Sequence, residues 1–365
     1  MSELQEIPDK PLRKGYTTGA CATACVKSAL LSLVTQKEHK KVTITLPIGE
    51  DVSFSLKDIQ ITKEKCSSTT VKDAGDDPDV THLAEITATV NLNSNKEIKF
   101  IRGKGVGLVT LPGLEIKVGE PAINPVPRKM MRTVVHKILA DYNLESYGVD
   151  IMISVKDGEK LAKRTLNSRL GVLHGISILG TSGIVTPFSA ASYIASIRQG
   201  IDVALANNQY ELLINSGARS EKMLRNIFPE IKETACIHYG NWIKETFEKI
   251  AESPEIHTVN MGIMLGKAAK LAEGNLNTHS GKTTWNKEFI AKLAKESGYS
   301  NEVSERILSL NMAGRLREIF IFAQQEKFYQ ILLKYCYEHC HKIAPEIELN
   351  LYLINNDQTH IKYNK

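Results

Sequence analysis

The chain has 365 residues, of which 42% are hydrophobic and 24% are charged. These proportions are typical of a folded globular protein and exclude an intrinsically disordered chain. The net charge of +5 is spread over segments that also carry glutamate. A nucleic-acid-binding protein gathers its basic residues on one face, so we expect no nucleic-acid partner.

The length exceeds one ordinary hydrophobic core and predicts two domains, which we place at residues 1–186 and 187–365. No apolar run approaches the length of a membrane span, and MSELQEIPDKPLRKGY lacks the apolar stretch of a signal peptide. We therefore expect a cytoplasmic protein without a membrane partner. The six cysteines predict reduced thiols instead of a disulfide framework. A homodimer stays open.

The first domain is predicted to have an α+β fold. Several strand-like runs follow one another through short polar links, which favours an antiparallel or mixed sheet with helices on one face. The expected helices cover 19–35 and 128–141, and the expected strands cover 41–49, 52–61, 84–92, 97–103 and 150–155.

The first predicted helix opens with unusually small residues, Thr17, Thr18 and Gly19. One interpretation is that an anion or a narrow ligand approaches the unpaired N–H groups of the helix start. The other is that Thr18 caps the helix while the following alanines pack against a sheet. A second small-residue turn, formed by Gly180, Thr181, Ser182 and Gly183, favours a ligand cradle because one cradle would explain both turns.

The segment KDAGDDPDVTH, residues 72–82, concentrates carboxylates around a proline turn. Clustered carboxylates repel one another unless a cation, a donor network or a shared proton offsets the repulsion. Asp77, Asp79 and His82 are therefore candidates for a general base or for a dock that holds a cationic ligand. Ordinary Asx turns are the alternative. A magnesium or calcium site also stays open, although the spacing matches no standard loop.

A glycine-rich segment covers residues 102–131. The dinucleotide fingerprint requires a glycine where Leu108 stands, and the lysine of a phosphate-binding loop is missing. The segment instead predicts a strand or hairpin whose backbone approaches a ligand. Arg128 follows two prolines at a helix start, where it could grip a carboxylate with both ends of its guanidinium group. A surface ion pair is the alternative.

The second domain repeats the order strand, glycine turn, helix three times. This order predicts right-handed crossovers and a parallel sheet, and hence a Rossmann-like α/β domain. The three units cover 210–228, 234–253 and 257–274; a long helix precedes them at 189–208, helices dominate 286–344, and one last strand is expected at 348–356.

His279 follows the third of these units. Ligands bind at the carboxyl ends of strands in open α/β sheets, so His279 is a candidate acid, base or binding group; a structural role is the alternative. The pairs Cys21 and Cys25, and Cys336 and Cys340, lack the third cysteine of an S-adenosylmethionine radical motif. Beyond the alternative in the acidic loop we expect no metal site, although His339 and His341 leave one open near the second pair.

Six segments, in this order over residues 12–280, resemble the cobalt-precorrin-5B C1-methyltransferases of anaerobic cobalamin biosynthesis. The resemblance implies transfer of a methyl group from S-adenosylmethionine to ring carbon C1 of a cobalt corrinoid, giving cobalt-precorrin-6A. Cobalt then belongs to the substrate. It also implies an α+β domain followed by a Rossmann-like domain. The segments are GYTTGACATA, AGDDPDVTH, GKGVGLVTLPGL, GEPAINPVPR, ISILGTSGIVTP and LGKAAKLAEGNLNTHS.

Methyl transfer is an in-line displacement, so the protein chiefly aligns donor and acceptor and excludes water. The expected partner is an anionic cobalt corrinoid, whose carboxylates call for cationic side chains and backbone donors. Asp77, Asp79 and His82 would face the sulfonium or take a proton from the substrate. The residues expected to bind substrate or donor are Thr17, Thr18, Gly19, Lys104, Asn124, Arg128, Gly180, Thr181, Ser182 and His279.

Two positions in the acidic loop depart from the family pattern GGDDPDVTHG: Ala74 and Leu83 stand where the flanking glycines are expected. Two other functions also remain open. One is an ATP-dependent small-molecule kinase, because TTGACATA resembles a nucleotide-holding loop. The other is a corrinoid carrier that binds the pigment without consuming S-adenosylmethionine.

Overall fold

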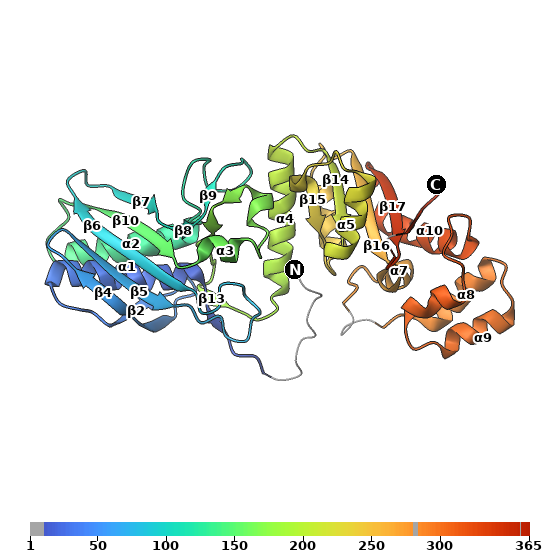
Figure 1. Ribbon diagram of the computed structural model, residues 1–365, viewed down its shortest axis with the longest axis horizontal. Coiled ribbons are helices and arrows are strands. Elements are labelled where there is room, and N and C mark those ends of the chain that lie inside the picture. Colours follow the sequence, from blue (N-terminus) through green and yellow to red (C-terminus); the bar gives the residue numbers. More distant parts are fainter. Residues whose placement is uncertain (1–10, 280–283, 358) are drawn as a thin grey trace. The chain divides into compact units, whose positions relative to one another are not determined.

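The computed structural model describes residues 11–279, 284–357 and 359–365. The chain forms two compact units: one ends at Ser189 and the other begins at Ala190 (Figure 1). Both combine helices with β-sheets, so the chain has a mixed α/β structure.

The first unit is built on a five-stranded sheet with the order β4-β5-β6-β10-β7 (Figure 1). Neighbouring strands are antiparallel except β10 and β7, which are parallel, and the mixed sheet is confirmed. β5 was not predicted, because its buried face carries Ser68 and Thr70 in place of large apolar residues. The strands are β4 (Lys57–Ile61), β5 (Lys65–Val71), β6 (Glu85–Asn93), β7 (Ile98–Arg102) and β10 (Gly148–Val155).

Two helices, α1 (Thr18–Thr35) and α2 (Pro125–Asp141), pack against each other, and α1 contacts β5 and β6. Both were expected. The mean hydropathy of α1 is 1.3 over 18 residues, so by length and composition it qualifies as a membrane span. The expectation that no apolar run reaches that length is therefore wrong. Burial of 78% of the helix inside this unit is typical of a core helix.

Short strand pairs join distant parts of the first unit. The glycine-rich segment does not fold back on itself as a hairpin, because β8 pairs with β12 and β9 pairs with β11. At Gly105 a Cβ atom would lie 2.0 Å from the Val155 carbonyl oxygen, so only glycine fits there. The remaining elements are β1 (Gly15–Tyr16), β2 (Lys41–Thr45), β3 (Asp51–Ser55), β8 (Gly105–Val106), β9 (Leu108–Val109), α3 (Gly158–Ala162), η1 (Asn167–Leu170), β11 (Val172–Leu173), β12 (Gly175–Ile176) and β13 (Ile184–Val185).

The second unit contains a five-stranded sheet with the order β15-β14-β16-β17-β18. The first four strands in this order are parallel, as the repeated strand–turn–helix pattern predicts. β18 adds an antiparallel edge, so the expectation that β17 is the last strand is wrong. The strands are β14 (Glu211–Asn215), β15 (Cys236–His238), β16 (Thr258–Met264), β17 (Glu348–Ile354) and β18 (His360–Lys362).

Helices flank this sheet and continue beyond it (Figure 1). The second unit has α4 (Ala190–Ala206), α5 (Ala218–Ile227), η2 (Glu233–Ala235), α6 (Ile243–Ala251), α7 (Leu265–Ala272), α8 (Lys287–Glu296), α9 (Asn301–Ser309), η3 (Ala313–Glu318) and α10 (Lys327–His341). α5 contacts β14 and β16, whereas α7 and α10 contact β17.

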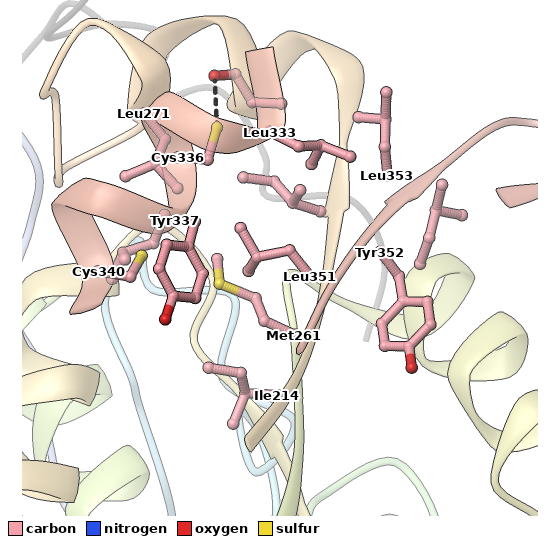
Figure 2. Packing of buried hydrophobic residues seen from close by; sticks show 14 of the residues in the cluster. Ile214, Met261, Leu271, Leu333, Cys336, Tyr337, Cys340, Leu351, Tyr352 and Leu353 are labelled. Atoms are coloured by element: carbon pink, nitrogen blue, oxygen red, sulfur yellow. Dashed lines mark hydrogen bonds between the residues drawn. The ribbon is translucent and has the colours of Figure 1, made fainter. Parts of the chain in front are cut away.

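The core of the second unit lies between the sheet and α10. The register pairs Ile214 with Met261 and Met261 with Leu351, so the three side chains share one face of the sheet. Figure 2 shows Tyr337 and Cys340 of α10 over this row. All six cysteines of the chain are buried and none forms a disulfide, as expected of reduced thiols. They act as small packing residues.

Candidate functional site

The acidic loop connects the adjacent strands β5 and β6. Backbone hydrogen bonds close its base, from Lys72 N to Ala84 O (2.9 Å) and from Leu83 N to Lys72 O (2.8 Å). Two distant segments dock on it: Tyr16 N donates to Asp73 O (2.7 Å), and Phe188 N donates to Asp77 Oδ1 (2.9 Å). We call residues 13–19, 72–82 and 178–188 together the loop assembly.

Cations hold two of the loop carboxylates. Arg13 donates to both oxygens of Asp73, which lowers the pKa of that carboxyl to about 2. Lys72, with 1% of its side chain exposed, forms an ion pair of 2.7 Å with Asp79. Burial opposes ionisation of Asp79, but the attraction of Lys72 and the hydrogen bonds from Thr81 outweigh it, so the pKa of Asp79 lies below its usual value. The carboxylate repulsion that the sequence implies is thus largely offset within the protein.

Asp77 differs from these two residues. It is partly buried, and burial raises its pKa despite the hydrogen bond from Phe188. Within the described residues it forms no ion pair with a lysine or arginine. A carboxylate whose pKa is raised toward neutrality is a better proton acceptor than a salt-bridged one. His82 accepts a hydrogen bond from Ala74 N at Nδ1 (3.1 Å), beside Asp73.

The start of α1 is capped by Thr17 and not, as expected, by Thr18. Thr17 Oγ1 accepts from Ala20 N (3.2 Å), while Thr18 Oγ1 accepts from Leu179 N (2.9 Å). Gly19 N donates to Leu179 O (2.9 Å). The backbone amide of Gly19 is therefore satisfied by the chain itself, because the 177–180 backbone lies where an anion was envisaged.

The two small-residue turns lie against each other in the loop assembly. Thr17 N donates to Gly183 O (3.0 Å), and a Cβ atom on Gly180 would lie 2.3 Å from Thr17 Oγ1. Ser182 Oγ donates to Ile184 O (3.1 Å), and Thr181 is exposed. Close packing of the turns accounts for their small residues, and their role in ligand binding stays a prediction.

The other predicted binding residues of this unit are held differently. The Arg128 guanidinium donates to the carbonyl oxygens of Ile123 (2.7 Å) and Pro121 (3.1 Å) and pairs with Glu120 (2.7 Å). The structure therefore gives Arg128 the ion-pair role that was the alternative at the sequence level. Asn124 precedes α2 and its backbone N–H donates to Ile178 O (2.9 Å), whereas Lys104 is exposed. Substrate binding by these three residues stays a prediction.

Leu83, one of the two departures from the family pattern, has a φ of 62° and a side chain that is 65% exposed. A left-handed backbone conformation strains a leucine by about 1–2 kcal/mol, and a glycine removes that strain. Part of the stabilisation is lost again, because glycine has more conformational freedom in the unfolded chain. We expect Leu83→Gly to raise the free energy of unfolding by about 0.5–1 kcal/mol. Urea unfolding measures it, with Val118→Gly as an exposed control that should destabilise. A loss of stability in Leu83→Gly would contradict the backbone argument.

The second unit offers a different site, at the carboxyl ends of its central parallel strands. The chain places β15 on one side of β14 and then β16 on the other, and such a reversal opens a crevice where ligands bind. A cleft of about 1570 Å³ lies there. Its walls include Ser216–Ser220 after β14, His238 and Asn241 at β15, Lys267 and Lys270 on α7, and Trp285–Glu288 at the start of α8.

Two lysines of α7 bring positive charge to this cleft. The Lys267 ammonium donates to the carbonyl oxygen of Gly240 and to Asn241 Oδ1 (2.6 Å). Burial, followed by repulsion from Lys270, lowers the pKa of Lys267 to about 8, so it still carries its charge at neutral pH. Lys270 Nζ donates to Thr278 O (3.3 Å).

Comparison with known proteins identifies the family. The family description CbiD matches residues 5–187, and CbiD, C-terminal domain, matches residues 277–364. The chain belongs to the CbiD family.

Named relatives of this CbiD chain align over most of its length. The cobalt-precorrin-5B C(1)-methyltransferase of Priestia megaterium is 43% identical over 91% of both chains. That of Prosthecochloris aestuarii is 42% identical over 94% of both. A crystal structure of the cobalamin biosynthesis protein cbiD from Archaeoglobus fulgidus is 27% identical, with a TM-score of 0.41 over 80% of this chain and 86% of that one.

Several residues in and beside the cleft of this CbiD chain were not predicted. His238, which lines the cleft, and Glu221 lie in no motif; a hydrogen bond of 2.5 Å joins them, and both side chains are 7% exposed. Lys267 lies in the segment LGKAAKLAEGNLNTHS, but nothing in that segment singles it out as a cleft residue. His279 follows Thr278, which lines the cleft, and its backbone N–H donates to Asn277 Oδ1 (3.2 Å). A role for His279 in binding stays a prediction.

Proposed function

We propose that this chain is an S-adenosylmethionine-dependent methyltransferase that converts cobalt-precorrin-5B to cobalt-precorrin-6A by methylating C1, a step of anaerobic cobalamin biosynthesis. The observation that carries the proposal is the 43% identity over 91% of both chains with the Priestia megaterium enzyme of that name. Identity of 36% over 95% of this chain with a Leptospira interrogans enzyme of the same name adds support. Neither a kinase nor a carrier is favoured by these names.

S-adenosylmethionine supplies a methyl carbon bound to a positively charged sulfur. C1 of the corrinoid provides the electron pair of the new carbon–carbon bond, and the sulfur keeps the pair of the bond that breaks. The chain has to hold C1, the methyl carbon and the sulfur in line and exclude water. No covalent intermediate with the protein is needed.

The loop assembly suits the cationic donor. Asp77 is a carboxylate without a lysine or arginine partner within the described residues, so a sulfonium nearby would be attracted to it. Its raised pKa also makes it the candidate base for a proton that the substrate releases. Asp79 and His82 then position the loop around Asp77, through Lys72 and Ala74 respectively.

The domain assignment belongs to the same proposal. Residues 1–186 form the α+β domain that carries all of the loop assembly except its last two residues, and residues 187–365 form a Rossmann-like domain that acts in the cytoplasm. Parallel pairing of β15, β14, β16 and β17 supports the second assignment.

Genetic complementation tests the proposed function. A bacterium that makes cobalamin anaerobically and has its own CbiD gene deleted is given the gene for this chain. We expect restored cobalamin-dependent growth and a cell extract that contains the C1-methylated product. A host that expresses the chain stably yet accumulates cobalt-precorrin-5B would contradict the proposal.

A further inference from the structure

The cleft of the second unit is larger than an ordinary nucleoside pocket. Its volume of about 1570 Å³ exceeds the 300–1,000 Å³ that is usual for small-molecule sites. Apolar side chains from four elements or loops form part of its wall: Tyr193 on α4, Met264 at the end of β16, Trp285 before α8 and Met312 before η3. Broad apolar walls of this kind fit the face of a large flat ring.

Charge in the cleft favours an anion. Four cationic side chains line it against two carboxylates, and the first residues of α5 also form part of the wall. The cations are Arg219, Lys267, Lys270 and Lys287, and the acids are Glu273 and Glu288. Glu273 is already engaged, because it accepts from the side-chain amides of Asn275 (3.0 Å) and Asn286 (2.6 Å).

The end of β14 adds a buried donor. Asn215 is fully buried and its Oδ1 accepts from Gly217 N (3.0 Å), one residue before α5 begins. Its amide nitrogen has no hydrogen-bond partner within the part of the chain that the structure describes. Such a donor is costly to bury unsatisfied, and Asn215 lies directly before the cleft wall of Ser216–Ser220 without being part of that wall.

A nucleoside fits the same cleft poorly. In dinucleotide-binding sheets of this kind an acidic residue at the end of the strand beside the first one binds the ribose hydroxyls. Here that strand, β15, ends in His238, and the nearby carboxylate of Glu221 is bonded to this histidine. The donor S-adenosylmethionine also carries a net positive charge, which the four cations would repel.

We propose that this cleft binds the polycarboxylate macrocycle, the methyl acceptor, and that Arg219, Lys267 and Lys270 hold its acetate and propionate groups. The inference rests on the proposed function for the identity of the macrocycle. The corrinoid ring lies against the apolar wall, and carboxylates at its rim meet the α7 lysines and the start of α5. The methyl donor binds elsewhere.

Binding measurements on the full-length protein test this assignment. Cobalt-precorrin-5B is titrated anaerobically and followed by its visible absorbance, while labelled S-adenosylmethionine is measured by equilibrium dialysis. We expect Lys270→Gln and Arg219→Gln each to raise the Kd of the corrinoid about 10-fold, the loss of one charge-assisted hydrogen bond. The Kd of the donor should change less than twofold.

Lys222→Gln on the exposed face of α5 and Lys334→Gln on α10 are matched controls that lie outside the cleft. Both should leave the corrinoid Kd unchanged. Folded cleft variants that bind the corrinoid as the wild type does, or that lose the donor instead, would overturn the assignment. Failure of this assignment can be told apart from failure of the proposed function. If the wild type methylates the corrinoid but the cleft variants bind it normally, only the assignment fails. If the cleft variants lose corrinoid binding but the wild type transfers no methyl group, only the proposed function fails.

Discussion

Replacing Asp79 by asparagine is expected to lower the free energy of unfolding by about 3 kcal/mol. The substitution leaves the Lys72 ammonium, 1% exposed, without its counter-charge. Breaking a buried ion pair from one side costs about 3–5 kcal/mol, and the 24% exposure of Asp79 places the expected loss at the lower end. Urea unfolding followed by circular dichroism measures it.

Two controls separate charge from shape. Asp157→Asn breaks an exposed pair with Lys160 and should cost far less than Asp79→Asn, because solvent screens exposed pairs. The double variant Lys72→Met/Asp79→Asn should recover at least about 1 kcal/mol relative to Asp79→Asn, because no buried charge is left alone. Additive losses in the double variant would rule out the ion pair as the cause.

Acid should remove the difference in the free energy of unfolding between the wild type and Asp79→Asn. The pKa of Asp79 is lower in the folded protein than in the unfolded chain, so its contribution is fully present above the unfolded value, near pH 4. It is lost as the pH falls through the folded value. The free energies of unfolding of the wild type and Asp79→Asn should therefore differ strongly at pH 7. The difference should shrink toward zero as the pH is lowered below 4.

Replacing Asp77 by asparagine is expected to lower kcat about 100- to 10,000-fold, the range for loss of a general base. Asparagine keeps the shape and still accepts the hydrogen bond from Phe188 N, so the free energy of unfolding should change by less than about 1 kcal/mol. Single-turnover methylation measures the chemical step, and the Kd of the corrinoid is measured alongside.

Asp141→Asn, the same change at the exposed end of α2, should leave kcat unaltered. His82→Gln removes a group that accepts from Ala74 N, and its effect on kcat should be below about 10-fold because it acts through the loop. If Asp77→Asn turned over at the wild-type rate, the loop assembly would have no part in the proton transfer.

Much of the fold could be predicted from local pattern. Strands with alternating large apolar residues, such as β6 and β10, and the strand–turn–helix repeats that form the parallel sheet were expected. β5 was missed because serine and threonine fill its buried face. The glycine-rich segment was expected to be a strand or hairpin, but nothing local indicates that β8 and β9 pair with strands that follow α3.

The site was predictable only in parts. The sequence identified the acidic residues and predicted one cradle for both small turns, but it did not indicate that the acidic loop docks beside them through Tyr16 and Phe188. The cap of α1 was misplaced by one residue because both threonines suit the position. Lys72, which holds Asp79, gave no signal, because the sequence does not show that its side chain turns inward.

The most direct test of the account is the mass spectrum of the corrinoid after anaerobic incubation of the purified chain with cobalt-precorrin-5B and methyl-labelled S-adenosylmethionine. We expect the gain of one labelled methyl group, located on C1. A corrinoid that binds but gains no label, under conditions in which the Priestia megaterium enzyme transfers it, would contradict the account and favour a carrier.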